Sequence, residues 1–253
     1  MTLDREHVDI LDIEVTPLTA HALLSYIDEV VVAGEGIRIA GHNLHSVYLY
    51  HSVPTFKRFY DDADVVLVDG APVLAALNRG SSKGKRKRFS SETRIGSTDW
   101  IGKIGSAQSV HRVALIGSSP ASNAGAVKAL LSNNPQLQVL GIPGAGWSDQ
   151  MLETAMSKIA EFKPDVLLIG LGMPLQESVA TTISLSQPSI VIATVGGAID
   201  QLSGAQKNAP RWLGRLGLEW LWRLTSQPRR LWHRYLVEPA MLAVLLLKKK
   251  GKS

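Results

Sequence analysis

Six short apolar runs, spread along the chain, constrain its fold more than any other feature of the sequence. Each run has three to five residues without polar alternation, and several end at Gly, Asp or Ser. Runs of this kind are typical of strands that are buried on both faces, as in a parallel sheet. They are Ile37–Ala40, Val65–Val68, Arg112–Ile116, Val139–Gly141, Val166–Ile169 and Ile190–Thr194.

Segments with helical spacing separate several of these runs. In Ala121–Leu131 the apolar residues Val127, Leu130 and Leu131 recur at i, i+3 and i+4, and Met151–Phe162 has a similar pattern. Strands that alternate with helices predict an α/β fold with a doubly wound, mostly parallel sheet. Ligands of such sheets bind beyond the carboxyl ends of the strands, so the residues that follow the strands are the candidates for function.

Charge divides the chain into two parts. The net charge at pH 7 is +5, but residues 207–253 carry +9 and residues 1–206 carry −4. We therefore expect an α/β core at 1–206 and a basic appendage at 207–253. A basic segment indicates an anionic partner, for which nucleic acid and an anionic membrane surface are both candidates.

The appendage has helical composition on both sides of Gln227-Pro228, over Trp212–Arg223 and Arg229–Leu247. Proline starts a helix or interrupts one, so we expect two or three amphipathic helices. Four of the six tryptophans lie in this part of the chain beside arginine and leucine, a composition that favours the membrane interface. The run Lys248–Lys250 adds attraction to anionic lipid.

Composition argues against several classes of protein. A hydrophobic fraction of 45% and a charged fraction of 19% argue against disorder, and the lack of cysteine excludes disulfides, thiolate zinc sites and cysteine nucleophiles. Residues 1–14 are acidic, so we expect no signal peptide. The longest apolar run, Pro239–Leu247, has nine residues, against the roughly 20 that span a bilayer. No HxH or HExxH motif is present, and we expect no bound metal.

One internal segment, Arg79–Arg94, is basic, rich in Gly and Ser, and without periodicity. We expect a mobile, solvated loop. Contact with phosphate or with a membrane surface is the alternative role.

Asp69 and Gly70 follow the buried run Val65–Val68. A carboxylate in this place can act as a general base whose pKa is tuned by partial burial. An aspartate at a strand end also commonly caps the next helix, and position alone does not separate the two roles.

Glycines follow two other runs. Gly117 and Ser118–Pro120 form a turn in which backbone N–H groups can approach a phosphate, although a plain tight turn has the same composition. Gly196 and Gly197 let the backbone approach a ligand closely. Asp200 can then accept hydrogen bonds from hydroxyls, or it can simply cap a helix.

The turn Gly170–Glu177 (GLGMPLQE) places an amide and a carboxylate after two glycines and a proline. The amide of Gln176 can bind a sugar hydroxyl or a nucleobase edge, because it has both a donor and an acceptor. The competing interpretation is a helix start with Glu177 in its first turn.

Taken in order, these motifs resemble the WecG/TagA/CpsF glycosyltransferases, family 26 of the glycosyltransferase classification. The resemblance covers about residues 10–237, and its most specific parts are the GxPxQE turn and the LEWxxRL segment that precedes a proline. The matching residues are Asn43, Asp69-Gly70, Arg94–Asp99, Gly170–Glu177, Gly196–Asp200, Gly204, Ala209–Trp212, Leu218–Leu224, Pro228–Arg230 and Arg234-Tyr235.

The resemblance implies a Rossmann-like core and an inverting transfer of one sugar from a UDP-sugar to a polyprenyl-diphosphate-linked saccharide. It implies that the enzyme acts on the cytoplasmic face of the cell membrane, in the synthesis of teichoic acid, common antigen or exopolysaccharide. It also implies that the reaction needs no metal or other cofactor. We expect an anionic membrane surface as a partner and no nucleic acid. The alternative function is a non-catalytic basic module, on an α/β core, that binds a membrane surface or nucleic acid.

The resemblance also assigns residues. It makes Asp69 the general base and Gln176 a substrate contact, and it gives the arginine-rich appendage a part in membrane association and in completing the site. We expect the nucleotide to approach Gly117, Gly172, Gly196 and Gly197. We expect substrate contacts from Asn43, Arg94, Asp99, Gln176, Glu177, Asp200, Arg211, Arg223, Arg230 and Arg234.

Two positions depart from the family pattern. Gly41 replaces a threonine that many members have two residues before the asparagine, and His233 replaces a frequent arginine. Both departures leave the identity of donor and acceptor open. N-acetylmannosamine, its uronic acid, glucose and galactose all remain as donor sugars, and the sequence leaves the oligomeric state, a homo-oligomer included, undetermined.

Overall fold

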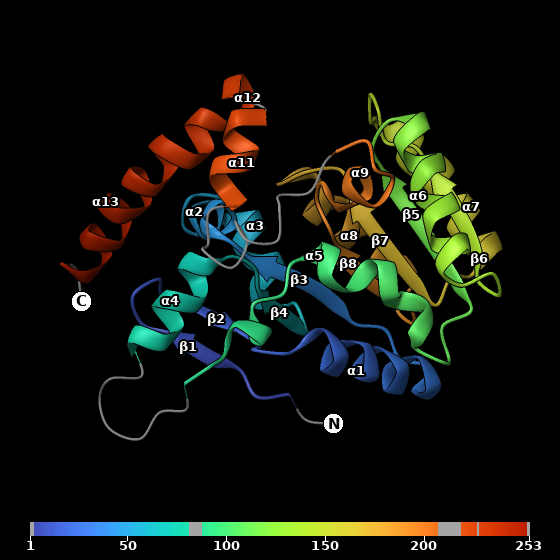
Figure 1. Ribbon diagram of the computed structural model, residues 1–253, viewed down its shortest axis with the longest axis horizontal. Coiled ribbons are helices and arrows are strands. Elements are labelled where there is room, and N and C mark those ends of the chain that lie inside the picture. The colour runs from blue at the N-terminus through green and yellow to red at the C-terminus, as the bar shows by residue number, and fades with distance from the viewer. Residues whose placement is uncertain (1–2, 81–87, 207–218, 227, 252–253) are drawn as a thin grey trace.

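A computed structural model describes residues 3–80, 88–206, 219–226 and 228–251 of the chain. Its centre is a six-stranded sheet in the order β4-β3-β8-β7-β5-β6, in which every neighbouring pair is parallel. The sheet confirms the six predicted strands and the α/β class (Figure 1). The strands are β3 (Arg38–His42), β4 (Val65–Val68), β5 (Arg112–Gly117), β6 (Gln138–Ile142), β7 (Val166–Gly170) and β8 (Val191–Thr194).

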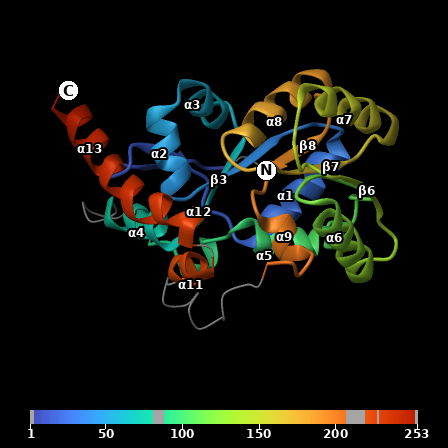
Figure 2. The same ribbon diagram turned by 90° about the horizontal axis from the view of Figure 1, so that it is seen from above.

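Helices cover both faces of this sheet, as Figure 2 shows from above. Side chains alternate along each strand, so Ile39 and Leu67 join one core cluster while Ala40 and Val66 join the other. The first cluster contains α1 (Ala20–Ala33), α5 (Ser97–Trp100), α6 (Pro120–Asn133) and α9 (Ala198–Leu202). The second contains α3 (Pro54–Asp61), α7 (Asp149–Phe162) and α8 (Leu175–Ser186). Strands buried on both faces explain why their sequences lack polar alternation.

A short antiparallel hairpin, β1 (Glu6–Val8) and β2 (Ile13–Val15), lies outside the main sheet. It was not predicted, because three-residue strands that contain charged residues give little periodic signal. Thr16 connects the hairpin to β4, since its N–H donates to the Val66 carbonyl (2.6 Å) and its hydroxyl accepts from the Val66 N–H (3.1 Å). With α2 (Leu44–Ser52) and α4 (Ala71–Gly80), the hairpin encloses a third apolar cluster.

The basic segment Arg79–Arg94 is structured at both ends. Arg79 lies in the last turn of α4, and Ser91–Thr93 forms a 3-10 turn, so the expectation of a loop throughout is wrong for these residues. Asn78 holds the far side of the segment, because its amide exchanges two hydrogen bonds with the backbone of Phe89 (2.9 and 3.0 Å). Residues 81–87 lie outside the described part of the chain.

The C-terminal segment is helical, as predicted, wherever the structure describes it. Its elements are α11 (Glu219–Ser226), α12 (Pro228–Trp232), a π-helical turn (His233–Val237) and α13 (Glu238–Lys250). Pro228 starts α12, in agreement with the helix break expected at this proline. Residues Trp212–Leu218 of the predicted helix lie outside the described residues. None of the described helices is both long and apolar enough to cross a bilayer.

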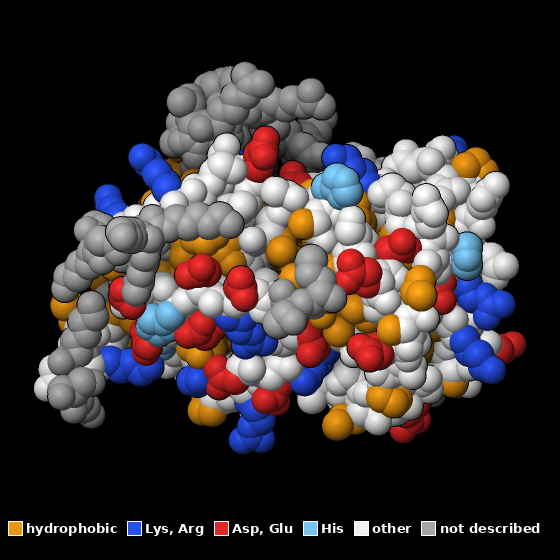
Figure 3. Space-filling model, turned by 90° about the horizontal axis from the view of Figure 1, so that it is seen from below, with side chains coloured by type: hydrophobic (Ala, Val, Ile, Leu, Met, Phe, Trp, Pro, Cys, Tyr) orange, Lys and Arg blue, Asp and Glu red, His pale blue; other side chains and the backbone are white. Residues whose placement is uncertain are grey.

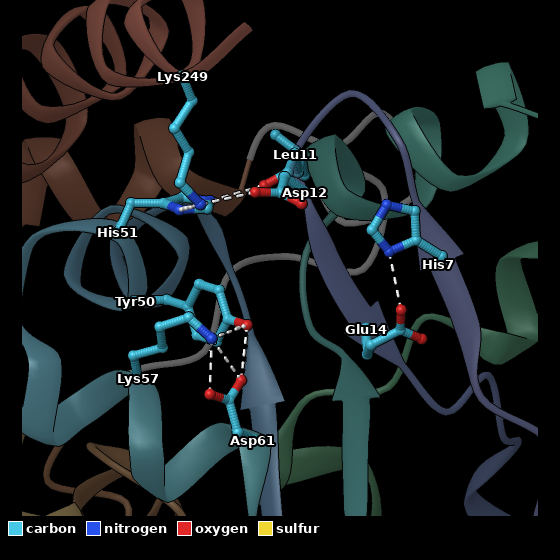
Figure 4. A network of polar contacts seen from close by, with 9 residues as sticks. All are labelled: His7, Leu11, Asp12, Glu14, Tyr50, His51, Lys57, Asp61 and Lys249. Atoms are coloured by element: carbon cyan, nitrogen blue, oxygen red, sulfur yellow. Dashed lines mark hydrogen bonds and ion pairs between the residues drawn. The ribbon is translucent and has the colours of Figure 1, made fainter. Parts of the chain in front are cut away.

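Helix α13 packs along α2, and its far end meets the hairpin (Figure 1). Figure 4 shows Lys249 reaching Asp12, with 2.7 Å between Nζ and Oδ2, and lying beside His51. His51 in turn contacts the Leu11 carbonyl through Nε2 (2.8 Å). Lys249 and Asp12 are about half exposed, so this pair contributes only about 0–1 kcal/mol, and the packing of Leu242 in the third cluster holds the helix.

Gly117 is required by the packing of the sheet at the end of β5. Its φ is +136°, and a Cβ atom there would lie 2.3 Å from the carbonyl oxygen of Gly170. Asn123 closes the same turn, because its side-chain amide donates to the carbonyls of Gly117 (3.0 Å) and Ile142 (3.2 Å). The turn therefore joins β5, β6 and β7 tightly.

We expect Gly117→Ala to lower the free energy of unfolding by about 1–3 kcal/mol, because it adds a steric clash to an unfavourable φ. Gly146→Ala is the matched control, since Gly146 also has a positive φ of +72° but has no atom within 4 Å of an added Cβ. Chemical denaturation of both variants measures the difference. Equal losses in the two variants would contradict the packing role.

Candidate active site

Two adjoining cavities open at the carboxyl edge of the sheet. The larger, of about 320 Å³, lies between the core and the C-terminal helices. The smaller, of about 160 Å³, lies beyond the ends of β3, β4 and β8. Four polar residues line both cavities and so form their common wall: Asn43, Asp69, Arg94 and Arg234. All four were predicted to be functional residues.

Asp69 follows β4, and its N–H donates to the His42 carbonyl of the neighbouring strand (2.9 Å). The segment after Arg94 runs beside β4, because the Ile95 N–H donates to the Val68 carbonyl (3.0 Å). Gly96 then approaches the carboxylate so closely that an added Cβ would lie 3.0 Å from Asp69 Oδ1. The glycine thus allows this loop to close over the aspartate.

Asn43 fixes the orientation of Asp69. Its Oδ1 caps α2 by accepting from the N–H groups of His45 (3.1 Å) and Ser46 (3.2 Å), and it also accepts from Arg234 (3.4 Å). The opposite end of the amide, Nδ2, therefore faces Asp69 and donates to Oδ2 (3.2 Å). Reversing the amide would turn a donor toward the backbone donors of the helix, so this orientation is fixed.

Arg94 and Arg234 bring two guanidinium groups to the common wall, one from the core and one from the C-terminal helices. Arginine is suited to this position, because its guanidinium stays charged and binds phosphate in a bidentate manner. Of the other appendage arginines predicted to contact substrate, Arg211 lies outside the described residues, and the side chains of Arg223 and Arg230 are not described either.

The walls of the two cavities differ in character. The larger cavity has apolar contributions from Leu44, Trp220, Tyr235 and Pro239, of which the last three come from the C-terminal helices. The smaller cavity is lined by three predicted glycines, Gly172, Gly196 and Gly197. Gly172 and Gly196 have positive φ angles of +81° and +54°, so these turns bring backbone close to the cavity.

Some of the other residues predicted to contact substrate or nucleotide line the cavities, and others do not. Asp99 lines the smaller cavity and accepts a hydrogen bond from the Gly96 N–H (2.7 Å), which holds the Gly96 loop in place. Gln176 also lines this cavity, although its side chain is bonded within the protein. Gly117 and Asp200 line neither cavity.

His42 is the last residue of β3, and no pattern in the sequence indicated that it is buried. His42 is buried and stacks on Tyr60 at 4.3 Å between ring centroids. Burial lowers the pKa of His42 to about 3, so the ring is neutral at pH 7. The Tyr60 hydroxyl donates to the Gly41 carbonyl (3.0 Å), and the pair thereby supports the end of β3 beneath the site.

His45 and Glu238 join the core to the C-terminal helices. Glu238 is buried in the first turn of α13, and its carboxylate contacts His45 Nδ1 on α2. Burial, and then the nearby Arg234 guanidinium, lower the pKa of His45 below its usual value, which favours a neutral ring that donates to Glu238. The sequence carried no local signal for this contact, because the two residues are 193 positions apart.

Gly41 was noticed only as a departure from a family pattern, yet it also lines the smaller cavity. A Cβ at this position would lie 3.4 Å from Asp69 Cβ, an ordinary van der Waals distance. The backbone and packing therefore do not require glycine here. Its effect is to leave open space beside the aspartate.

Among the residues that the structure describes, no three His, Asp or Glu side chains gather so as to hold a metal ion.

Two adjoining cavities beyond the strand ends of an α/β sheet, with a carboxylate and two arginines in their common wall, have the features of an enzyme active site. A sequence profile of the glycosyl transferase WecG/TagA/CpsF family matches residues 8–253. The chain therefore belongs to this family and is a glycosyltransferase.

Named relatives support the assignment. One from Bacillus spizizenii is 27% identical over 94% of this chain and 88% of its own length. One from Bacillus subtilis is 33% identical over 56% of this chain and 54% of its own, and one from Staphylococcus aureus is 32% identical over 42% of each. The matched segment thus spans about half or less of the last two relatives. All three are named N-acetylglucosaminyldiphosphoundecaprenol N-acetyl-beta-D-mannosaminyltransferase.

We expect Asn43→Ala to lower the free energy of unfolding by about 1 kcal/mol through loss of a helix cap, and to reduce transfer activity as well. Thr19→Ala is the matched control, because Thr19 caps α1, away from both cavities, through a hydrogen bond from the Ala22 N–H (3.2 Å). Denaturation should show similar losses, and only Asn43→Ala should lose activity. Full activity in Asn43→Ala would contradict its role at Asp69.

Proposed function

We propose that this chain is an inverting glycosyltransferase that moves a sugar from a UDP-sugar to a polyprenyl-diphosphate-linked saccharide in cell-surface polysaccharide or teichoic acid synthesis. The names of the relatives favour N-acetylmannosamine as the sugar and an N-acetylglucosamine-diphosphate lipid as the acceptor. The observation that carries the proposal is the common wall, where one carboxylate and two guanidinium groups face both cavities. The family membership disfavours the alternative of a non-catalytic basic module.

We assign the donor to the smaller cavity and the acceptor to the larger one. The turns at Gly172, Gly196 and Gly197 suit a nucleotide diphosphate, because glycine lets backbone N–H groups approach phosphate oxygens. The larger cavity suits a lipid-linked sugar, because Trp220 and Tyr235 offer apolar and aromatic surface. The larger cavity also lies beside the C-terminal helices, which are the part of the chain that we expect to contact the membrane.

In this arrangement Asp69 is the general base. It removes the proton from the acceptor hydroxyl as that oxygen attacks the anomeric carbon on the face opposite the diphosphate. The new carbon–oxygen bond forms while the bond to the diphosphate breaks, so the configuration inverts and UDP leaves. The guanidinium groups of Arg94 and Arg234 stabilise the charge on the departing phosphate, a role for which we propose that no divalent metal is needed.

The C-terminal helices are the proposed membrane contact, on the inner face of the cell membrane. Trp232, Leu236, Val244 and Leu247 are all more than half exposed. Lys248 and Lys249 follow them, and apolar residues with flanking lysines bind anionic bilayer surfaces through two additive terms. On the face drawn in Figure 3, by contrast, acidic and basic side chains are interspersed, as on an ordinary solvated surface.

The enzymatic test is transfer from a panel of UDP-sugars to short-chain polyprenyl-diphosphate-N-acetylglucosamine, followed by mass spectrometry with and without a chelator. We expect one preferred donor, and we expect Asp69→Asn to lower the rate at least about 100-fold while the protein stays folded. Asp61→Asn is the control, because Asp61 pairs with Lys57 on the surface (2.6 Å). Full activity in Asp69→Asn would remove the aspartate from the mechanism.

The membrane contact is tested by replacing Leu236, Val244 and Leu247 together with glutamate. We expect binding to phosphatidylglycerol vesicles to fall at least about tenfold in a flotation assay, while transfer to a water-soluble acceptor persists. Replacing Val32 and Leu185 with glutamate is the control, because they are 73% and 81% exposed on other helices. Equal losses in both variants would show that the C-terminal helices are not the contact surface.

A further inference from the structure

Glu177 is a buried acid that the proposed mechanism does not use. It lies in the first turn of α8 and is only 2% exposed. Its Oε1 accepts a hydrogen bond from Gln176 Nε2 (2.8 Å), whereas Oε2 is buried with no hydrogen-bond partner among the described residues. Burying a carboxyl group is unfavourable, and burial raises the pKa of Glu177 to about 7. Glu177 lines neither cavity, although it was predicted to contact substrate, so its burial calls for another explanation.

The neighbouring amide of Gln176 is engaged at both ends. Its Oε1 accepts from the Gly196 N–H (3.0 Å), and its Nε2 donates to Glu177. A carboxyl oxygen opposite Nε2 admits only this orientation, because the reversed amide would set oxygen against oxygen and NH₂ against N–H. Glu177 therefore decides which end of Gln176 faces Gly196.

Gly196 connects the oriented amide of Gln176 to the smaller cavity. With a φ of +54°, it begins the turn between β8 and α9, and both Gly196 and Gly197 line the smaller cavity. The hydrogen bond from Gly196 to Gln176 joins this turn to the start of α8, across two neighbouring strands of the sheet. Without an oriented acceptor at Gln176, the Gly196 N–H would lose this buried partner.

We propose that Glu177 is a positioning residue for donor binding: through Gln176 it holds the Gly196-Gly197 turn in the conformation that lines the smaller cavity. The inference rests on the proposed assignment of that cavity to the donor. It needs an acceptor oxygen at position 177 and not a negative charge, because a protonated carboxyl or an amide offers the same oxygen to Nε2.

The test compares Glu177→Gln, which keeps the acceptor, with Glu177→Leu, which removes it. Isothermal titration with UDP and steady-state kinetics measure the effect in the whole 253-residue chain. We expect Glu177→Leu to weaken UDP binding and raise the donor KM roughly tenfold, with a smaller change in kcat, and Glu177→Gln to stay within about threefold of wild type. Ser178→Ala, an exposed neighbour on α8, is the matched control.

Two results would overturn the proposal: wild-type UDP affinity in Glu177→Leu, or equal losses in Glu177→Leu and Glu177→Gln. Amide hydrogen exchange at Gly196–Ile199 provides a readout that needs no ligand. Faster exchange in Glu177→Leu than in Glu177→Gln supports the positioning role even if the wild type binds no UDP, an outcome that would refute only the donor assignment. Unchanged exchange in Glu177→Leu would refute the positioning role itself.

Discussion

The side-chain amide of Asn43 is the interaction on which the rest of the site depends. Its oxygen accepts hydrogen bonds from the first turn of α2 and from Arg234, so its nitrogen is turned toward Asp69. One group thus starts a helix, orients a carboxylate and receives the C-terminal segment. Because helix capping decides the direction of the amide, the geometry at Asp69 follows from the secondary structure of the core.

The two cavities are built by different means, and this separates their chemistry. Backbone turns of the sheet form the smaller one, and their shape is set by hydrogen bonds such as that from Gly196 to Gln176. The larger one is completed by side chains of helices that pack on the core, held by Leu242 and by the contact of Glu238 with His45. A change at Trp220, Tyr235 or Pro239 therefore alters only the larger cavity, whereas a change at Arg234 alters both.

The sequence predicted all six strands of the main sheet, because strands buried on both faces are apolar throughout. It could not show which strand ends form the site, because small and polar residues follow every one of these strands. Asp69 lies at the ends that form the cavities, whereas Gly117 packs against β7 and Asp200 lies outside both. The burial of His42 and Glu177 depends on packing between distant elements, which no local pattern encodes. The roles of the candidate residues remain predictions.

The contact between Asn43 and Arg234 joins residues 191 positions apart. During synthesis, the sheet and its strand-end turns leave the ribosome well before the segment that carries Arg234. Until that segment has emerged and packed on α2, the larger cavity lacks the wall formed by Trp220, Tyr235 and Pro239. The order of translation therefore separates completion of the core from completion of the site, and a nascent chain with a finished sheet is not yet a finished enzyme.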